Sequence, residues 1–254
     1  MNRYAFLIPV YRHGLALDGV LSSLEKYNLP FIIVDDGNCG SDREHIRAAQ
    51  KKYRSVILVE HKKNRGKGKS VNDGILKAHE LGITHVLQID SDGQHDASQV
   101  PFFLEQSRMF PEAVICGYPE YDASVPASRL NGRKIANFWI HVVTLSFEIK
   151  DALIGFRVYP VEPYYSLLKH HAVIDSHMGF DIDILVHLHW KNIKIISCPV
   201  NVSYPKDGIS NFRLVRDNLH ISLTYARLCA GMIFRLPVLI FRAAQRKKNA
   251  KALV

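Results

Sequence analysis

The sequence predicts an α/β fold with a Rossmann-like, mostly parallel central sheet flanked by helices. Two observations predict it. Short apolar runs rich in β-branched residues recur along the chain, and segments with apolar residues at helical spacing lie between them. Acidic residues follow several of the runs directly. Strands that alternate with helices favour a parallel sheet, and such sheets bind their ligands at the carboxyl ends of the strands.

Each predicted strand is a short apolar run bounded by polar or glycine-containing turns. The runs cover residues 4–10, 31–34, 55–59, 85–90, 113–116 and 193–202. The first run is apolar throughout, which is typical of a strand that is covered on both faces. The predicted helices cover about residues 17–24, a segment from 41, a segment from 70 to 81, 128–147 and 179–190. A basic, glycine-broken loop is expected at residues 64–70.

Composition limits the class of protein. The chain has 254 residues, of which 47% are hydrophobic and 22% charged, as in ordinary globular proteins. Its 33 Lys and Arg against 24 Asp and Glu give a net charge of +9, which suggests a polyanionic partner: nucleic acid, nucleotide phosphates or an anionic membrane. The four cysteines are far apart, which argues against a zinc site or a disulfide framework and fits a reducing, cytoplasmic setting. The N-terminus lacks a signal-peptide layout.

The strand that ends near Asp90 runs into the acidic turn Asp90-Ser91-Asp92-Gly93. In extended backbone, residues i and i+2 point to the same side, so both carboxylates can face one cation. Mg²⁺ and Mn²⁺ prefer such oxygen ligands, with substrate phosphates filling other positions. A polar turn after a strand is the alternative, because Asp-x-Asp alone is common.

A second acidic strand end is formed by Asp35 and Asp36. The predicted topology places these carboxylates on the same sheet edge as Asp90 and Asp92. The basic loop at residues 64–70 is a phosphate neighbour or a solvated turn, with equal weight.

Four motifs in order resemble the nucleotide-sugar half of family 2 inverting glycosyltransferases, especially dolichyl- and polyprenyl-phosphate mannose synthases. They are Ile8-Pro9-Val10-Tyr11, Val34-Asp35-Asp36-Gly37, Asn64-x-Gly66-Lys67-Gly68 with Asn72 and Gly74, and Asp90-Ser91-Asp92-Gly93-Gln94-His95. The resemblance covers residues 4–116 and continues to about residue 217. It implies a GT-A fold. Arg12-His13-Gly14 departs from the family, which has Asn-Glu after the first strand.

The resemblance also implies roles for the residues in these motifs. Asp35 and Asp36 would lie near the nucleoside, and Asp90 and Asp92 would hold Mg²⁺ or Mn²⁺ with the diphosphate of the nucleotide sugar. The remaining donor-side positions are Pro9, Tyr11, Lys67, Asn72 and Ser91, with Gln94 and His95 beside the metal turn. His95 has a turn-capping role as its alternative.

The second half is expected to bind the acceptor. Asp151-Ala152-Leu153-Ile154-Gly155-Phe156-Arg157 resembles a family segment beside the lipid-phosphate acceptor, so Asp151 becomes a candidate catalytic carboxylate. Arg157 and one of Arg129 and Arg133 could bind an anionic headgroup, because guanidinium groups bind phosphate well. Gly179-Phe180-Asp181-Ile182-Asp183 resembles the family's acidic segment, which supplies a catalytic or acceptor-side carboxylate. The resemblance makes Asp181, and after it Asp183, the candidates for the base that a hydroxyl acceptor would need. Charge at a helix N-terminus is the alternative reading of this pair.

The C-terminal part changes in character. We predict a glycosyltransferase domain over residues 1–211, with a family-like flexible loop near residues 204–213, and a basic, amphipathic helical extension over residues 212–254. Residues 228–241 are too few to cross a bilayer, which needs ~20 apolar residues. An in-plane helix on a membrane surface, with its arginines toward the lipid headgroups, fits better, and a helix packed on the domain is the alternative.

The favoured function is a metal-dependent inverting glycosyltransferase that moves a sugar from a nucleotide sugar to a lipid or lipid-phosphate acceptor, bound peripherally on the cytoplasmic face of a membrane. A nucleic-acid-binding protein is the alternative suggested by the charge, but four carboxylates at strand ends would repel a phosphate backbone. An inactive sugar-nucleotide-binding scaffold and a nucleotidyltransferase are further alternatives. The sequence specifies no sugar, base or acceptor.

Overall fold

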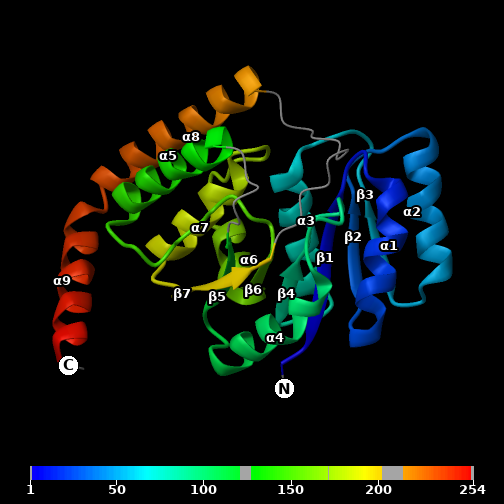
Figure 1. Ribbon diagram of the computed structural model, residues 1–254, viewed down its shortest axis with the longest axis horizontal. Coiled ribbons are helices and arrows are strands. Elements are labelled where there is room, and N and C mark those ends of the chain that lie inside the picture. Colours follow the sequence, from blue (N-terminus) through cyan, green and yellow to red (C-terminus); the bar gives the residue numbers. More distant parts are fainter. Residues whose placement is uncertain (1, 121–126, 171, 202–213, 253–254) are drawn as a thin grey trace.

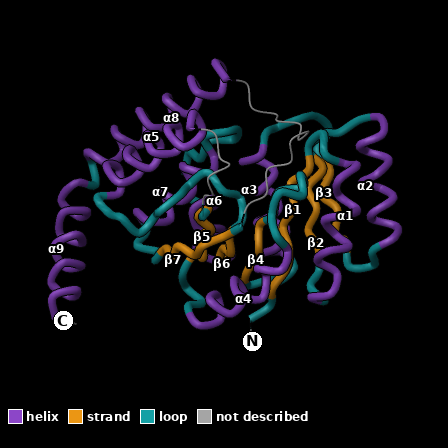
Figure 2. Tube along the Cα trace, in the orientation of Figure 1, coloured by secondary structure: helices purple, strands orange, loops and turns teal. Residues whose placement is uncertain are grey.

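A computed structural model describes residues 2–120, 127–170, 172–201 and 214–252 (Figure 1). In this part of the chain a single seven-stranded sheet lies between two layers of helices, as the tube in Figure 2 shows. The strands are β1 (Tyr4–Val10), β2 (Phe31–Asp35), β3 (Val56–Glu60), β4 (His85–Gln88), β5 (Val114–Pro119), β6 (Arg157–Pro160) and β7 (Ile195–Val200). The predicted α/β architecture is confirmed.

The α-helices connect the strands and form both outer layers. They are α1 (Gly14–Leu24), α2 (Gly40–Lys52), α3 (Lys67–Glu80), α4 (Val100–Met109), α5 (Ala127–Thr144), α6 (Val161–Lys169), α7 (Phe180–Trp190), α8 (Leu214–Ile233) and α9 (Leu236–Ala252). Two short 3₁₀ helices, η1 (Glu25–Tyr27) and η2 (Ala97–Gln99), complete the described helical segments.

The strand order is β3-β2-β1-β4-β6-β5-β7. Strands β1 to β4 pair in parallel, β5 and β7 also pair in parallel, and β6 is antiparallel to both of its neighbours. The sheet is therefore mostly parallel, as predicted. Because β1, β2 and β4 end at one edge, the residues that follow them meet there.

The hydrophobic core has two parts, one on each face of the sheet. Helices α1, α2 and α4 cover one face, and α3, α5, α6 and α7 cover the other. In β1 every residue is buried, as expected for a strand covered on both faces. Alternate residues serve alternate faces, with Leu7 in one part and Phe6 in the other.

Four local features differ from the predictions. Helices α4 and α6 were not expected. Helix α3 begins at Lys67, so four of the seven residues of the expected basic loop form its first turn. Strand β6 was not expected, because Arg157-Val158-Tyr159-Pro160 is short and begins with a charged residue. The arginine is nevertheless fully buried. Its hydrogen bonds, described below, compensate the burial of its charge.

The C-terminal helices differ in their contact with the domain. Helix α8 lies alongside α5 (Figure 1), and its Tyr225 and Leu228 belong to the core. Helix α9 buries Leu239 but exposes Ile240 and Phe241. The expected domain boundary between residues 211 and 212 and the expected loop at 204–213 lie outside the described residues. The description resumes at Leu214, where α8 begins.

No single helix in the described ranges has the length and apolar character that a bilayer crossing requires. One bent pair of helices has that length and apolar character when the two are taken together: Asp217–Ile233 and Leu236–Arg246, with a bend of 83° between them.

Candidate active site

The acidic turn after β4 is built by the local sequence. The amide of Gln94 donates a hydrogen bond of 3.0 Å to Asp92 Oδ1, which closes a turn of the kind that Asp side chains form with nearby amides. Gly93, between them, has φ +74°, a conformation that glycine adopts without strain. The turn leaves the Asp90 side chain 26% exposed and buries Ser91. Asp90 therefore lies at the sheet edge where the sequence places it.

An ammonium group joins Asp90 to Asp181. The Lys67 Nζ lies 3.0 Å from Asp90 Oδ1 and 3.1 Å from Asp90 Oδ2, and 2.9 Å from Asp181 Oδ2. Lys67 begins α3 and Asp181 lies in the first turn of α7, so three separate segments meet at one point. The predicted metal turn and the first candidate base are thus neighbours.

The charges in this cluster stabilise one another. Burial opposes the charge of Lys67, but the carboxylates of Asp181 and Asp90 outweigh it and raise the pKa of Lys67. Burial also opposes the charge of Asp90, yet Lys67 and His95 hold the pKa of Asp90 well below its usual range. Both groups are therefore charged at neutral pH.

The first turn of α3 is fixed against the segment before α7. Gly66 has φ +92°, and a Cβ there would lie 2.2 Å from the carbonyl oxygen of Ser176. A Cβ at Gly68 would lie 2.3 Å from the carbonyl oxygen of Asp175, and the Gly68 amide donates to Ser176 at 2.9 Å. Only glycine permits this approach, which aims the Lys67 side chain at both carboxylates.

The Asp36 carboxylate, buried after β2, organises the segment that precedes α3. It accepts hydrogen bonds from the Asn64 side chain and from the amides of Arg65 and Gly66, at 2.8–2.9 Å. His61 Nδ1 lies 2.8 Å from it, and the other ring nitrogen lies 3.0 Å from Asp73. Asp36 thus reaches the predicted sheet edge, but protein groups surround its oxygens.

Asp35 and the residues near it form a second buried network. Asp35 Oδ1 accepts from the amide and the side chain of Asn38, at 2.8 and 2.7 Å. Asn38 in turn accepts from the Arg12 amide at 2.7 Å. Pro9 is buried within β1, and the Arg12 guanidinium lies 5.1 Å from the centroid of the half-buried Tyr11 ring. These hydrogen bonds join the segments that follow the carboxyl ends of β1 and β2.

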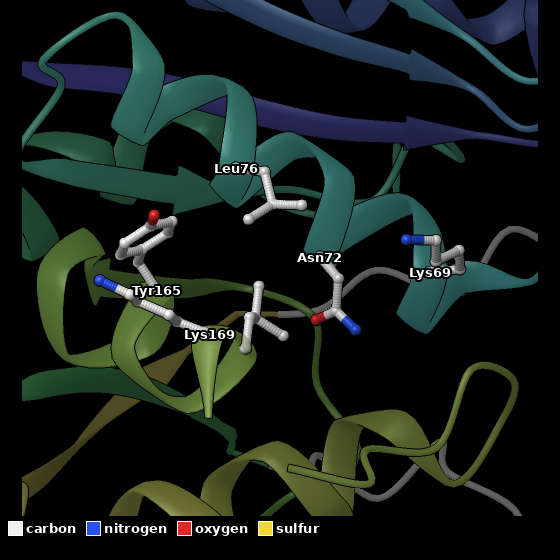
Figure 3. Close-up of a pocket in the computed structure, with 6 residues that line it drawn as sticks. Lys69, Asn72, Leu76, Tyr165 and Lys169 are labelled. Carbon is white, nitrogen blue, oxygen red and sulfur yellow. The ribbon is translucent and has the colours of Figure 1, made fainter. Parts of the chain in front are cut away.

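Asn72, also on α3, hydrogen-bonds to a residue of α6 rather than to the cluster around Lys67. Its Oδ1 accepts a hydrogen bond of 2.7 Å from the hydroxyl of Tyr164 on α6. It also lines a cavity of about 290 Å³ between α3 and α6 (Figure 3). The other lining residues are Lys69, Leu76, Tyr165, Leu168 and Lys169. The contacts of Asn72 therefore tie α3 to α6.

The candidate acceptor residues occupy three different environments. Arg133 Nη1 donates to Asp151 Oδ2 at 2.7 Å, so these two candidates form an ion pair whose carboxylate is almost completely buried. Arg157 is fully buried and donates to the carbonyl oxygens of Ala152 and Asp181, both at 2.8 Å. Arg129 lies in α5, and its side chain is outside the described part of the chain. Arg157 therefore fixes the backbone of Asp181 by a buried hydrogen bond to its carbonyl oxygen.

Asp181 and Asp183 point to different surroundings. Asp183 is fully buried and accepts hydrogen bonds from the amide of Asp175, at 2.6 Å, and from Arg227 on α8. Residues two apart on a helix lie on opposite faces, which separates Asp183 from Lys67. Of the two, Asp181 is the one that contacts the Lys67 and Asp90 cluster.

His95 lies beside this cluster. Its Nε2 is 3.8 Å from Asp90 Oδ2, and its ring packs on Phe156 with centroids 5.3 Å apart. Gly155 brings the neighbouring segment close, since a Cβ there would lie 2.4 Å from Asp90 Oδ2. Sequence reasoning did not assign a role to Gly155, although the Gly-Phe-Arg match marked its segment.

The residues present fit a divalent cation that a substrate helps to coordinate. Within the described ranges, no three His, Cys, Asp or Glu side chains converge as a complete metal site. However, Asp90 Oδ1 and Asp181 Oδ1 are buried and accept no well-aligned hydrogen bond within the described residues, although the Lys67 ammonium lies 3.0 Å from the first and the Arg157 guanidinium 3.6 Å from the second. Buried oxygens of this kind normally have a partner. Mg²⁺ is commonly held by one or two carboxylates with phosphates and water completing its shell.

The chain is similar to several known proteins. The chain is 26% identical over 217 residues to an uncharacterized protein of Methanocaldococcus jannaschii, covering 80% of this chain and 90% of that protein. It is 26% identical over 216 residues to the dolichyl-phosphate beta-glucosyltransferase of Dictyostelium discoideum, covering 77% of this chain and 64% of that enzyme. It is 22% identical over 173 residues to the UDP-N-acetylglucosamine–dolichyl-phosphate N-acetylglucosaminyltransferase of Methanococcus voltae, covering 60% and 67%.

Solved structures show the same fold at low identity. The structure of S. aureus TarS 1–349 in complex with UDP matches with a TM-score of 0.56 and 14% identity, covering 89% of this chain and 65% of that one. The complex with UDP-GlcNAc matches with a TM-score of 0.51 and 14% identity, covering 87% and 66%. The fold is therefore the GT-A fold that the resemblance implied. The sequence profile described as "Glycosyl transferase family 2" matches residues 5–168, and the chain belongs to this glycosyltransferase family.

Proposed function

We propose that this protein transfers a sugar from a UDP-sugar to a lipid phosphate of the dolichyl-phosphate type, with inversion at the anomeric carbon. The observation that carries the proposal is the meeting of Lys67, Asp90 and Asp181 at the carboxyl edge of the sheet. The dolichyl-phosphate transferases among the relatives, and the UDP complexes among the structural neighbours, support the choice of substrates.

The acidic turn would hold the donor diphosphate through a cation. Asp90 and Asp92 are the proposed ligands, and Mg²⁺ or Mn²⁺ would offset the charge that develops on the departing nucleoside diphosphate. Asp36 holds residues 64–66 in place and so shapes the wall on which the nucleotide rests. Lys67 adds a positive charge at the same place.

The chemistry at the acceptor depends on its protonation state. An acceptor phosphate oxygen attacks the anomeric carbon while the bond from that carbon to the diphosphate oxygen breaks on the opposite face. A phosphate is already ionised near neutral pH, so it needs no strong base. A hydroxyl acceptor would need a carboxylate to take its proton, and Asp181 is the one placed for this. Arg133 is the proposed headgroup ligand, because 18% of its side chain is exposed whereas Arg157 is fully buried, and Asp151 positions it.

A membrane surface is the proposed location. Large apolar side chains stand exposed along the connection from α8 to α9, and Phe234 is 86% exposed. Its exposed neighbours are Ile233, Val238, Ile240 and Phe241. Such a group can enter the interfacial region of a bilayer, and the net charge of +9 favours an anionic surface.

Transfer to a lipid phosphate can be measured directly. The purified protein is given labelled UDP-glucose or UDP-N-acetylglucosamine, with dolichyl phosphate or a dolichol bearing a free hydroxyl, and Mg²⁺ or Mn²⁺. We expect labelled lipid with the phosphate acceptor and a loss of about 100-fold or more in Asp90→Asn and Asp92→Asn. Asp96→Asn is the matched control, because Asp96 is exposed and near the turn. Near-normal transfer by both Asp90→Asn and Asp92→Asn in excess metal would overturn the role of the acidic turn.

A further inference from the structure

The Lys67 ammonium group lies in the gap between Asp181 and Asp90, the latter a proposed ligand of the divalent cation. We propose that Lys67 takes the place of the divalent cation beside Asp90 in the donor-free protein, and that its ammonium group moves onto the donor diphosphate when the metal binds. This inference rests on the proposed function, and it concerns the order and coupling of binding, not the reaction.

The ammonium group satisfies the charge of the gap only in part. Three carboxylate oxygens lie within 3.1 Å of Nζ, and the buried Arg157 guanidinium lies 3.6 Å from Asp181 Oδ1. Asp181 therefore has a second cation beside it, whereas the nearest cation to Asp90 is Lys67. One oxygen of each carboxylate, Oδ1 in both cases, accepts no well-aligned hydrogen bond and leaves an acceptor atom for a further cation.

A divalent cation and the ammonium cannot share the gap in its present form. A metal bound to Asp90 at about 2.1 Å would lie within about 5 Å of Nζ, because Nζ is already 3.0 Å from the same carboxylate. At that distance in a partly buried site, the repulsion between the two positive charges is strong. The ion pair between Lys67 and Asp90 must then break, and the Lys67 ammonium group needs another anion as its partner.

Only the side chain is free to move. The backbone on both sides of Lys67 is fixed by Gly66 and Gly68, which pack on the carbonyl oxygens of Ser176 and Asp175. The amides of Arg65 and Gly66 donate to Asp36, and those of Gly68 and Lys69 donate to Ser176. These four amides are therefore committed to protein acceptors. The long, flexible side chain of Lys67 carries the positive charge in this segment that lies beside Asp90 and can turn toward a phosphate there.

The movement of Lys67 from Asp90 to the diphosphate couples the binding of the metal to the binding of the nucleotide. Without a diphosphate, metal binding costs Lys67 its ion pair with Asp90 and offers it no new anion, so the metal binds weakly. With a diphosphate present, Lys67 gains a new partner and the metal binds more tightly. Coupling of this kind is reciprocal, so the metal must strengthen nucleotide binding by the same factor.

The test is Mn²⁺ binding, followed by electron paramagnetic resonance of the free ion, with and without saturating UDP. For the unchanged protein we expect weak binding that UDP strengthens about tenfold or more. In Lys67→Met, Mn²⁺ should bind at least about threefold more tightly without UDP, and the strengthening by UDP should largely vanish. Lys77→Met is the matched control, because Lys77 is also on α3 and also ion-paired, to Glu80 at 2.9 Å, and it should behave as the unchanged protein.

Two results would overturn the inference, and they have different consequences. If Lys67→Met binds Mn²⁺ no more tightly than the unchanged protein, or keeps the full effect of UDP, then Lys67 does not compete with the metal and the inference alone fails. If the unchanged protein binds no Mn²⁺ even with UDP, the metal role in the proposed function fails with it. Circular dichroism of Lys67→Met separates either result from loss of the fold.

Discussion

Arg227 on α8 donates a hydrogen bond to Asp183 in the first turn of α7, where the carboxylate is fully buried. The same carboxylate accepts from the amide of Asp175, whose own side chain accepts a hydrogen bond of 2.7 Å from Thr224 on α8. The segment from Asp175 to Asp183 also contacts the first turn of α3. Helix α8 is thereby connected, through polar contacts, to the backbone that carries Asp181.

Replacement of Arg227 should weaken the fold and loosen this connection. Arg227→Met keeps the aliphatic part of the side chain but leaves the buried Asp183 carboxylate without a charged donor, which should lower the free energy of unfolding by about 2 kcal/mol. Urea unfolding measures this. In a double-mutant cycle with Asp183→Asn, the two losses should be less than additive by about 1 kcal/mol. Additive losses would show that the two side chains do not interact.

Stability should fall on acidification because of His189. This histidine is completely buried, and burial first, then the charges of Arg246 and Arg242, lower its pKa from 6.5 to about 4. The folded state therefore resists protonation that the unfolded state accepts. Its contribution is fully present above pH 6.5 and is lost between pH 6.5 and 4, at up to about 1.4 kcal/mol per pH unit.

His189→Gln provides the comparison for this pH dependence. Gln does not titrate, and its side-chain oxygen can accept from Arg246 Nη1, which lies 3.2 Å from His189 Nε2. Glu148, whose carboxylate is 3.6 Å from His189 Nε2, is present in both proteins. Urea unfolding at pH 7, 6 and 5 should show a steeper loss in the unchanged protein than in the variant. Parallel curves would contradict the prediction.

Asp36 should matter to both stability and nucleotide binding. Asp36→Ala leaves the amides of Arg65 and the buried Gly66 without their acceptor, so we expect a loss of about 2–4 kcal/mol in the free energy of unfolding. The displaced loop should also weaken the binding of UDP, measured by calorimetry. Asp36→Asn retains one acceptor oxygen and should show a smaller effect on each. Unchanged stability together with unchanged UDP affinity in Asp36→Ala would contradict this account.

The exposed apolar residues near α9 should determine membrane binding. Phe234→Ser with Phe241→Ser removes two rings that are 86% and 62% exposed, and should lower binding to anionic vesicles at least about tenfold in a co-sedimentation assay. Leu15→Ser is the matched control, because Leu15 is 76% exposed on the distant α1. High salt should also reduce binding, by screening the basic residues. Equal sedimentation of all three proteins would show that this surface does not bind lipid.

Truncation of the tail would be a poorer test of the same idea. Arg246 contacts both Glu148 and His189, and Arg242 donates to the carbonyl oxygen of Trp190 at 3.0 Å. These two arginines, which the sequence suggested would face lipid headgroups, face the protein in the described structure. The basic residues Lys247 and Lys251 have side chains outside the described part. Deletion of residues 243–254 would therefore disturb packing as well as charge.

The sequence predicted the sheet well where its signals were local. Runs such as residues 4–10 are apolar throughout, and a strand buried on both faces requires just that. Strand β6 gave no such signal, since its burial depends on Arg157 finding carbonyl acceptors on Ala152 and Asp181. Those acceptors are 5 and 24 residues away, so a local reading of the chain does not reveal them.

For the site, residue types were predictable but their pairings were not. The family motifs marked Lys67, Asp90 and Asp181, yet the bridge between them spans 114 residues from Lys67 to Asp181. The different surroundings of Asp181 and Asp183 follow from helical geometry once α7 is docked. Thr224 and Arg227 carried no motif, and only the packing of α8 on α7 reveals their role.

The position of β5 in the sheet has a consequence for synthesis on the ribosome. Both strands that flank β5, namely β6 and β7, come later in the chain, so residues 114–119 emerge without a partner on either edge. An apolar strand with two open edges can pair with other chains. The first edge is closed only when Arg157–Pro160 has been made, and the second only after Ile195–Val200. Nascent chains that stall after residue 119 and before residue 157, when both edges are open, should therefore recruit chaperones most strongly.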